Sequence, residues 1–598
     1  MYARRMADGR SLSKIESMQT PRRFFLQGAA GGALAAPFLV SPAGAIVQSD
    51  TGRPGGPARR GGTPGSVTPE ERRRLAARAV FGPKEPVSGA SGMVICSHPL
   101  ATRAGADILR AGGNAVDAAL AASVTQTVVE PHMTGITGVL SLLYYDAATR
   151  RTHYVNGGMN APLAKLAGWG PTSLESGLGA GVPGFWAGYE ASRTKFGTKP
   201  SKDLCAAAIT YARDGFEIHP FLWGEMFTQM NNLGRTEQGR EIFFAGGAML
   251  NPGDLLVQAR AASTLERLVA EGNDFFYKGD FAKDYSKVVK DAGGVITPED
   301  FARYDVRFDE PARGTYRGYD VVASPVPDNG GSHLIEILNM LECLDLQKLG
   351  PAFESAETLW QMARICTQVY EEGSRHRDPK YRKVPLATIL SKEYARMRFD
   401  LLQMDGPMTT AATKPPVGSC HVTAIDKAGN VATVLHSCMS LPWSNGLFVN
   451  GVTIVASGAH FFRIMPGPGE RATVFVAPNI ILKNGRPVLA SGSPSASLLQ
   501  NIVQNTTNIL DFGMAIGESV NRPRFGNAYT PSGGLSMAVE ADFDPKVRDA
   551  ANARGLGLAT VNPQNYGMGS FEGIYIDPAT ARHSARGDTR RCSAAEAV

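Results

Sequence analysis

The chain has 598 residues, of which 43% are hydrophobic and 19% charged, which is enough to bury a large core. Its net charge is +6, but residues 1–45 hold six Lys/Arg and two Asp/Glu, so the remainder carries only about +2. A body this close to neutral argues against nucleic acid or an anionic membrane as the main partner. The seven cysteines form no Cys-x-x-Cys pair, which argues against a zinc site or a disulfide framework. After residue 45 no apolar run is long enough for a membrane span.

The N-terminal segment combines the three parts of an export signal in the expected order. The Arg-Arg pair at 22–23, followed by Phe-Phe-Leu-Gln, resembles a twin-arginine signal, and a Gly- and Ala-rich stretch runs from 28 to 40. The small residues at 43–45 form a signal-peptidase pattern. We therefore expect a signal peptide over 1–45, a periplasmic mature chain and a flexible leader over 46–75. The alternative is a basic tail ahead of a short core helix.

Periodicity and turn residues predict the first elements of the body. Small and apolar residues recur at helical spacing between 97 and 131, and Gly112-Gly113 divides this stretch into two helices, with Asn114 as the cap of the second. The elements expected next are a strand at 139–145, mainly helices over 195–310 with a helix start at 297–300, a strand at 319–323, and a helix over 333–344.

The chain changes character near residue 410, where a polar, proline-containing stretch predicts an exposed loop. Two alternating segments, 420–426 and 431–437, flank a Lys-Ala-Gly-Asn turn and predict a β-hairpin. The elements expected after it are strands at 451–455, 473–482 and 572–576 and a helix at 497–510. Because helices and strands occur in runs in both halves, one interleaved α/β unit is favoured over separate domains.

Several segments, taken together, resemble the γ-glutamyltranspeptidase family. They are 97–101, 113–119, 129–132, 182–184, 327–331, 492–494, 511–514 and 522–525. The resemblance implies an N-terminal nucleophile hydrolase with a four-layer αββα sandwich of α/β (α+β) class. It also implies a precursor that cuts itself once, here into a large subunit over 76–418 and a small subunit over 419–598 that stay together. No metal or organic cofactor is implied.

The family's cut lies before a Thr-Thr-His sequence, and the matching stretch here is Ser419-Cys420-His421. A hydroxyl beside a scissile peptide can attack the preceding carbonyl, and the new α-amine, with a typical pKa of about 7.7–8.0, can then act as general base. The resemblance places the cut after Gly418, which offers little steric hindrance, and the nucleophile at Ser419. Cys420 is a rival nucleophile that would need a cut one residue later. An inert site is the third interpretation.

Three more residues take catalytic roles by position in the family pattern. Ser437 falls where the family has a Thr that supports the nucleophile's hydroxyl. Ser495 and Ala496 fall where the family's oxyanion hole uses backbone N–H groups, which do not depend on the side chain. The alternative for these two residues is a Ser/Pro turn that leads into the helix at 497–510.

The positions that hold a γ-glutamyl group in the family are changed in this chain. Gly158 stands nearest the family's Arg and Met439 replaces an Asn, while His460 stands nearest the amine-binding Asp and Val474-Phe475 replace a Ser-Ser pair. Because Gly cannot replace a charge-assisted Arg–carboxylate pair, we expect a different acyl group, neutral and partly apolar. The other apolar residues expected around this pocket are Trp443, Phe448, Phe461 and Phe462.

The segment between Phe462 and Thr473 is too short for the lid loop that many family members carry, so water should reach an open site and hydrolysis should exceed transfer. The sequence thus predicts an exported, self-processing hydrolase of a small-molecule amide. Two alternatives stay open. One is a true γ-glutamyl transferase or glutathione hydrolase with an unusual pocket, and the other is a catalytically inactive relative that kept the fold as a binding protein.

Overall fold

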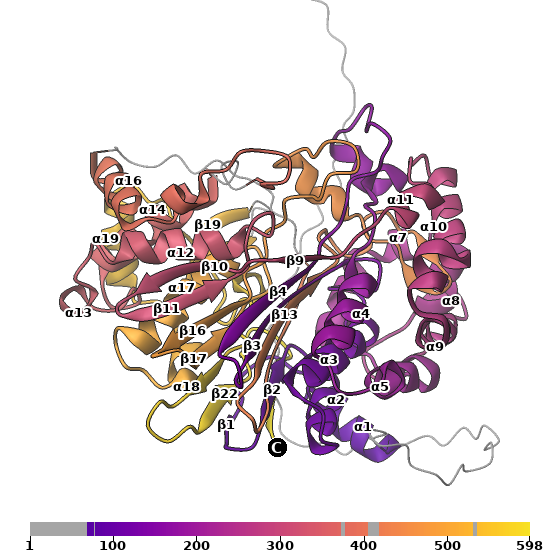
Figure 1. Cartoon of the computed structure of the whole chain (residues 1–598), viewed down its shortest axis with the longest axis horizontal. Coiled ribbons are helices and arrows are strands. Elements are labelled where there is room, and N and C mark those ends of the chain that lie inside the picture. The colour runs from indigo at the N-terminus through magenta and orange to yellow at the C-terminus, as the bar shows by residue number, and fades with distance from the viewer. Residues whose placement is uncertain (1–67, 77, 372–376, 405–417, 530–534) are drawn as a thin grey trace, which may run out of the picture. The chain divides into compact units, whose positions relative to one another are not determined.

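Two seven-stranded antiparallel sheets lie face to face in the computed structural model, which describes residues 68–598 except 77, 372–376, 405–417 and 530–534 (Figure 1). The first sheet has the order β1 (Pro86–Gly89), β22 (His583–Arg586), β21 (Ile574–Ile576), β17 (Arg486–Ser491), β16 (Asn479–Lys483), β11 (Tyr319–Ala323) and β10 (Ala312–Tyr316). The second has the order β23 (Ala594–Ala597), β2 (Met93–Cys96), β12 (Cys420–Ile425), β13 (Val431–Ser437), β3 (Val139–Asp146), β4 (Arg151–Gly157) and β9 (Arg307–Asp309).

A layer of helices covers the outer face of each sheet, which completes the predicted four-layer αββα sandwich (Figure 1). The helices against the second sheet include α2 (Pro99–Arg110), α3 (Ala115–Val129), α4 (Phe185–Phe196), α5 (Ser201–Asp214), α9 (Ala259–Asn273) and α10 (Asp280–Asp291). Those against the first sheet include α12 (Gly330–Leu341), α14 (Ala356–Glu371), α16 (Lys392–Met404), α17 (Leu498–Leu510) and α19 (Pro545–Ala553).

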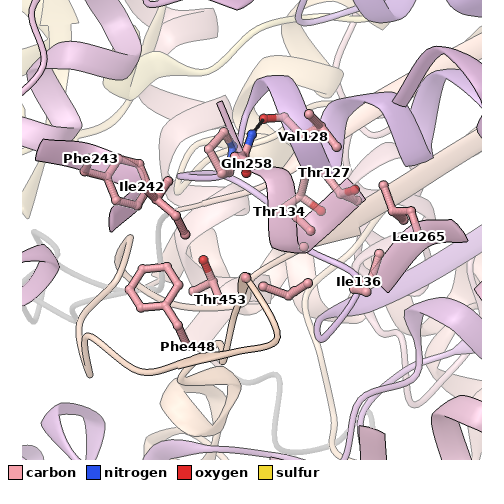
Figure 2. Close-up of a pocket in the computed structure, with 15 residues that line it drawn as sticks. Thr127, Val128, Thr134, Ile136, Ile242, Phe243, Gln258, Leu265, Phe448 and Thr453 are labelled. Carbon is pink, nitrogen blue, oxygen red and sulfur yellow. Dashed lines mark hydrogen bonds between the residues drawn. The ribbon is translucent and has the colours of Figure 1, made fainter. Parts of the chain in front are cut away.

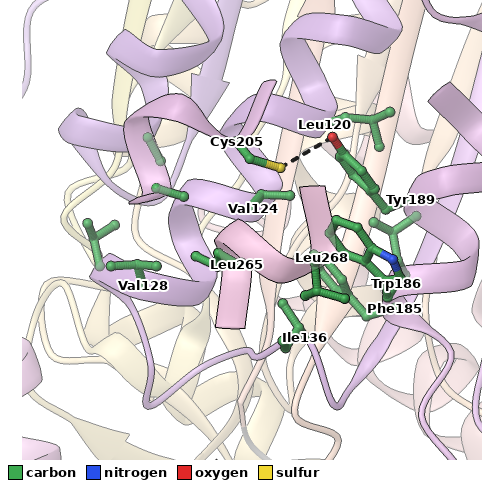
Figure 3. Packing of buried hydrophobic residues seen from close by; sticks show 14 of the residues in the cluster. Leu120, Val124, Val128, Ile136, Phe185, Trp186, Tyr189, Cys205, Leu265 and Leu268 are labelled. Carbon is green, nitrogen blue, oxygen red and sulfur yellow. Dashed lines mark hydrogen bonds between the residues drawn. The ribbon is translucent and has the colours of Figure 1, made fainter. Parts of the chain in front are cut away.

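The largest apolar cluster joins α3, α4, α5 and α9 to the second sheet (Figure 3). Within it Trp186 stacks on Tyr189, with ring centroids 4.7 Å apart, and the Tyr189 hydroxyl lies 3.4 Å from the Cys205 thiol. Burial of such side chains typically stabilises a fold by about 1.5–3 kcal/mol each. This cluster holds α3 rigidly against the strands that carry the candidate site.

Most elements expected from the sequence are confirmed. Asn114 caps α3 through a capping box with Asp117. At α11 (Pro298–Ala302) the N–H and the hydroxyl of Thr297 both donate to the Asp300 carboxylate. The predicted hairpin is β12–β13, whose turn is held by the Asp426 carboxylate. These strands, from the C-terminal half, pair with β2 and β3 from the N-terminal half, so the halves are interleaved as expected.

Other boundaries were wrong. The leader was expected to reach residue 75, but α1 (Pro69–Ala76) begins earlier, and Leu75 is buried in the main cluster. The strand expected over 473–482 is only β16, because the backbone of Val474 bonds instead to Pro327 and Asn329 in the loop before α12. That helix starts at Gly330 rather than at residue 333.

The proposed signal peptide and most of the leader lie outside the described residues. Among the helices that the structure does describe, none is long and apolar enough to cross a membrane.

Candidate active site

Ser419 stands immediately before β12, in the middle of the second sheet. Its Oγ lies 2.8 Å from the carbonyl oxygen of Gly418 and 3.0 Å from Oγ of Ser437 on the neighbouring strand β13. The backbone N–H of Met439 donates to Ser437 Oγ over 2.8 Å, and the Ser437 hydroxyl donates to the Gly418 carbonyl. The predicted nucleophile, its supporting hydroxyl and the predicted scissile peptide therefore meet in the uncut chain.

Each hydroxyl has one proton, which fixes the order of these bonds. Since Ser437 gives its proton to the Gly418 oxygen, its own oxygen can accept from both Met439 N–H and Ser419. This arrangement polarises the Gly418 carbonyl and leaves an oxygen of Ser419 beside it. This is the geometry that an intramolecular attack of Ser419 on the Gly418 carbonyl requires.

Gly418 is required by its backbone and by its neighbours. Its φ is +128°, a conformation that side chains rarely adopt. A Cβ atom there would lie 2.5 Å from the Cys438 Sγ and 2.7 Å from the Ser440 carbonyl oxygen. Any other residue would displace the scissile carbonyl from the two serines.

Cys420, the rival nucleophile, points to the opposite face of the sheet, as strand alternation requires. Its thiol is buried 3.4 Å from Glu130 Oε2, and burial, together with this carboxylate, raises its pKa well above the usual value. Glu130 also accepts from Ser97 and Gln126, while Gln126 bonds to His436. The geometry gives Cys420 a place in a buried polar network and leaves Ser419 partly exposed.

The predicted oxyanion positions follow β17. Ser495 has a φ of +112°, and within the part of the chain that the structure describes neither its N–H nor that of Ala496 donates a hydrogen bond. The preceding turn is held by Asn501 on α17, whose amide donates to Ser493 Oγ over 2.8 Å. Both residues line a small cavity together with Ser419, so two free backbone donors border the nucleophile.

His421 explains the glycine in the Gly-Ser-Pro segment. Its Nε2 lies 3.1 Å from Thr423 Oγ1 and 2.9 Å from Thr433 Oγ1, and burial lowers its pKa to about 3. A Cβ atom on Gly492 would lie 2.2 Å from this imidazole ring. The neutral ring thus packs β12 of the second sheet directly on the end of β17 of the first.

Three of the five predicted acyl-binding residues, Met439, His460 and Phe475, line the cavity of about 20 Å³ at Ser419. Tyr370 lines it too. Burial lowers the pKa of His460 to about 3 and raises that of Tyr370, so both are uncharged at neutral pH. Among the residues that the structure describes, this lining includes no Lys, Arg, Asp or Glu.

Gly158 and Val474 are not part of this lining. Beside Gly158 lies the side chain of Arg471, whose Cδ would be 3.1 Å from a Cβ there. This guanidinium is fully buried and donates to Asn156 and Asn160, so its donors are already used. Val474 packs in an apolar cluster with Met439 and Phe461.

The other apolar residues expected at the pocket also lie elsewhere. Trp443 and Phe448 pack in the main core around Phe243. Phe461 and Phe462 pack on Trp169, with centroids 5.4 Å and 5.3 Å away. These residues are close to the nucleophile strand in sequence. Their side chains do not reach it, because local turns point them into neighbouring clusters.

Another cavity, also of about 20 Å³, lies between α3, α9 and β14 (Phe448–Val449), where Gln258 donates to the Val128 carbonyl (Figure 2). It is walled mainly by apolar side chains such as Ile136, Leu265 and Phe448, and none of the described residues that line it is ionisable. It is therefore a poor candidate for a reaction centre.

The sequence reasoning missed a buried ionic cluster under the site. Arg524 bonds to Asp588 over 2.7 Å, and Arg590 bonds to both Asp588 and Glu540. Nearby, burial raises the pKa of Glu572 to about 8, and its carboxyl accepts from Ser593. The sequence signal for this cluster is the stretch 588–591, which contains charges of both signs. Among the described residues no group of three or more His, Cys, Asp or Glu could hold a metal.

A serine that begins a central strand between two stacked sheets, directly after a peptide it can attack, defines the class of N-terminal nucleophile hydrolases. Residues 101–598 match the family model "Gamma-glutamyltranspeptidase". The chain belongs to this family.

Its relatives include hydrolases and acylases. The chain is 31% identical over 540 residues to the glutathione hydrolase proenzyme of Escherichia coli (strain K12), covering 82% of this chain and 89% of the relative. It is 32% identical over 505 residues to the Acylase ACY 1 proenzyme of Pseudomonas sp. (strain SE83), covering 79% and 88%. The chain is accordingly an amidohydrolase or acyltransferase, and both of these relatives are named as proenzymes.

Among solved structures, cephalosporin acylase from Bacillus halodurans superimposes with a TM-score of 0.77 at 24% identity, over 86% of this chain and 97% of that one. At this identity the likeness bears on the fold.

Proposed function

We propose that the chain cuts its own Gly418–Ser419 bond and then hydrolyses an amide with a neutral, partly apolar acyl group. One observation carries the proposal. Ser419 Oγ lies 2.8 Å from the Gly418 carbonyl oxygen, and Ser437, fixed by the Met439 N–H, donates to that same oxygen.

Self-cleavage would begin with attack of Ser419 Oγ on the Gly418 carbonyl carbon, and the hydroxyl proton would pass to the departing nitrogen. The C–N bond breaks, an ester to Ser419 forms, and Ser437 stabilises the negative oxygen. Water then hydrolyses the ester and leaves Gly418 as a carboxylate. Ser419 becomes an N-terminal residue with a free α-amine.

In turnover, that amine would take the Ser419 hydroxyl proton, because an α-amine with a typical pKa of about 7.7–8.0 is partly neutral near pH 7. The oxygen attacks the substrate carbonyl, whose oxyanion is stabilised by the N–H groups of Ser495 and Ala496. The proton passes to the leaving amine, and water releases the acid from the acyl-enzyme.

The acyl preference is supported by the uncharged cavity lining of Met439, His460, Phe475 and Tyr370. It is also supported by Arg471, which lies beside Gly158 but has its donors engaged by protein groups. A γ-glutamyl group would need partners for one negative and one positive charge. Glutathione hydrolysis is the second candidate, because the Escherichia coli relative carries that name.

The cut is tested by intact mass of purified protein. The wild type should give a fragment that begins at Ser419, and Ser419→Ala should stay one chain without amidase activity. Ser419→Thr should still cut, because it keeps the hydroxyl, and Cys420→Ala should cut as the wild type does. A fragment that begins at Cys420 would move the nucleophile, and an uncut wild type that still hydrolyses amides would refute the mechanism.

We also propose twin-arginine export to the periplasm, supported by the Arg-Arg pair at 22–23 and the small residues at 43–45. Replacing Arg22 and Arg23 together by lysine should retain the protein in the cytoplasm in cell fractionation. Equal periplasmic amounts of variant and wild type would contradict this route.

A further inference from the structure

The segment 471–475 brings Phe475 into the wall of the small cavity beside the nucleophile, which we call the acyl cavity. Within this segment Val474 is bridged in parallel to Asp328, through backbone hydrogen bonds of 2.9 Å and 3.1 Å to the two residues that flank Asp328. The same loop leads into α12, whose His333 ring has its centroid 5.2 Å from that of Phe475. The loop that contains Asp328 therefore contacts the acyl wall by two routes.

Asp328 is a buried carboxyl group that joins the two sheets. It follows β11 of the first sheet, and its Oδ2 accepts from Ser141 on β3 over 2.6 Å and from Tyr154 on β4 over 2.5 Å, both in the second sheet. Its Oδ1 is buried without a hydrogen-bond partner, and no cation lies within 4.0 Å, among the described residues. Such a carboxylate is costly to bury, and costs of this kind are typical of functional positions.

Charges of opposite sign lie at the two ends of this arrangement. Burial raises the pKa of Asp328 to about 6, while the two hydroxyls and the buried Arg471 oppose this rise. Arg471 begins the segment 471–475, so the attraction between the two charges acts across the acyl wall. The other titratable groups that interact with Asp328 are Tyr154, Tyr304 and Asp309.

We propose that Asp328 is a positioning residue whose carboxylate holds the acyl wall through Val474 and so sets which acyl groups the cavity accepts. The inference rests on the proposed function and extends it. Once protonated, Asp328 no longer attracts Arg471, and its added proton has no acceptor at Oδ1 among the described residues. The wall then loosens and admits larger acyl groups. An Asp328 that only stabilises the fold is the alternative.

The test compares two 4-nitroanilides, acetyl and phenylacetyl, with the processed enzyme between pH 5 and 8. The measured quantity is the ratio of their kcat/KM values, in which titration of the α-amine cancels because it alters both substrates together. His460 and Tyr370 in the lining stay uncharged over this range. We expect the preference for the acetyl compound to fall about threefold or more as the pH falls, with a midpoint near pH 6. A constant ratio would overturn the proposal.

Variants assign the change to Asp328. Asp328→Asn keeps the size but cannot titrate, so its ratio should stay at the low-pH value throughout. Tyr154→Phe removes a hydrogen bond that favours the charged form, so its midpoint should move to higher pH. Asp320→Asn removes an equal charge from an exposed position on β11 and should leave the ratio and its midpoint unchanged. If Asp328→Asn keeps the wild-type pH dependence, the carboxyl of Asp328 does not control the wall.

A measurement without substrate separates failure of this inference from failure of the proposed function. Phe475→Trp, made in the Ser419→Ala chain, places a fluorescent ring in the acyl wall. Its emission, after subtraction of the Ser419→Ala parent, should change with a midpoint near pH 6, and adding Asp328→Asn should abolish the change. If neither anilide is cleaved, the proposed function fails while this titration still tests Asp328, and a constant emission refutes its role. If Asp328→Asn does not fold, the midpoint shift in Tyr154→Phe decides, and an unshifted midpoint contradicts the proposal.

Discussion

The two cavities that flank Gly418 differ in charge and in size. The acyl cavity is small and uncharged, with His460 and Tyr370 held neutral by burial. The other is larger, about 240 Å³, and is bordered by Glu225 and by Arg591, which interacts electrostatically with Glu225 but makes no ion pair within 4.0 Å among the described residues. Gly418, Ser495 and Ala496 belong to the walls of both cavities. The difference predicts that the larger cavity responds to the charge of a ligand and the smaller cavity to its shape and polarity.

Two arginines that are adjacent in sequence also differ in how their charge is compensated. Arg590 and Arg591 are both buried, but only Arg590 meets carboxylates. The two residues lie in the turn between β22 and β23, and the position of Glu540 and Asp588 decides which of the two is structural. Composition alone would treat them as equivalent.

The largest expected effect separates these two arginines by stability. Arg590→Gln leaves Glu540 and Asp588 buried without their partner, so it should lower the free energy of unfolding by about 3–5 kcal/mol. Arg591→Gln removes an unpaired charge and should change stability by less than about 1 kcal/mol or raise it. Both are compared by denaturant unfolding in the uncut Ser419→Ala background. Equal destabilisation would mean that Arg591 is structural and would weaken the contrast between the cavities.

The next effect concerns the acyl cavity. Two lost charge-assisted contacts should cost a γ-glutamyl substrate about two to three decades in kcat/KM relative to an uncharged acyl group. A panel of γ-glutamyl, acetyl, phenylacetyl and longer acyl 4-nitroanilides with processed enzyme measures this. If the kcat/KM of the γ-glutamyl compound is tenfold higher than that of the others, the acyl cavity does not prefer a neutral group. Glutathione hydrolysis then becomes the favoured function.

The smallest expected effect concerns Glu225, whose pKa is raised by burial and only partly lowered again by Arg591. At high pH its negative charge opposes a carboxylated leaving group. As the pH falls through its raised pKa, the carboxyl becomes neutral. The wild-type preference for a 3-carboxy-4-nitroanilide over the 4-nitroanilide of the same acyl group, measured as the ratio of their kcat/KM values, should therefore increase about two- to fivefold. Glu225 and Arg591 are the charged residues of this wall.

Glu225→Gln should show the higher preference at all pH values and lose the pH dependence. The ratio of the two anilides, measured between pH 5 and 8.5, isolates this effect from titration of the α-amine, which alters both substrates together. If the variant kept the pH dependence, Glu225 would not be the group whose charge affects the carboxylated anilide.

The sequence alone predicted the hairpin from its local order, and the family resemblance predicted the cut position and the catalytic candidates. Alternation along 420–426 and 431–437 fixed two strands and their turn, and the register then placed Ser437 beside Ser419. The motif at 492–496 likewise identified the two backbone donors, since a turn before a helix is a short-range feature.

Only the tertiary structure decided which side chains surround the reacting peptide. Trp443 and Phe461 are near the nucleophile strand in sequence but pack into separate clusters, while Tyr370 and Arg591 come from distant segments. Cavity walls and charge pairing depend on which elements pack together across the two sheets. That packing is set by long-range burial, and no local pattern in the chain encodes that Arg590 is paired and Arg591 is not.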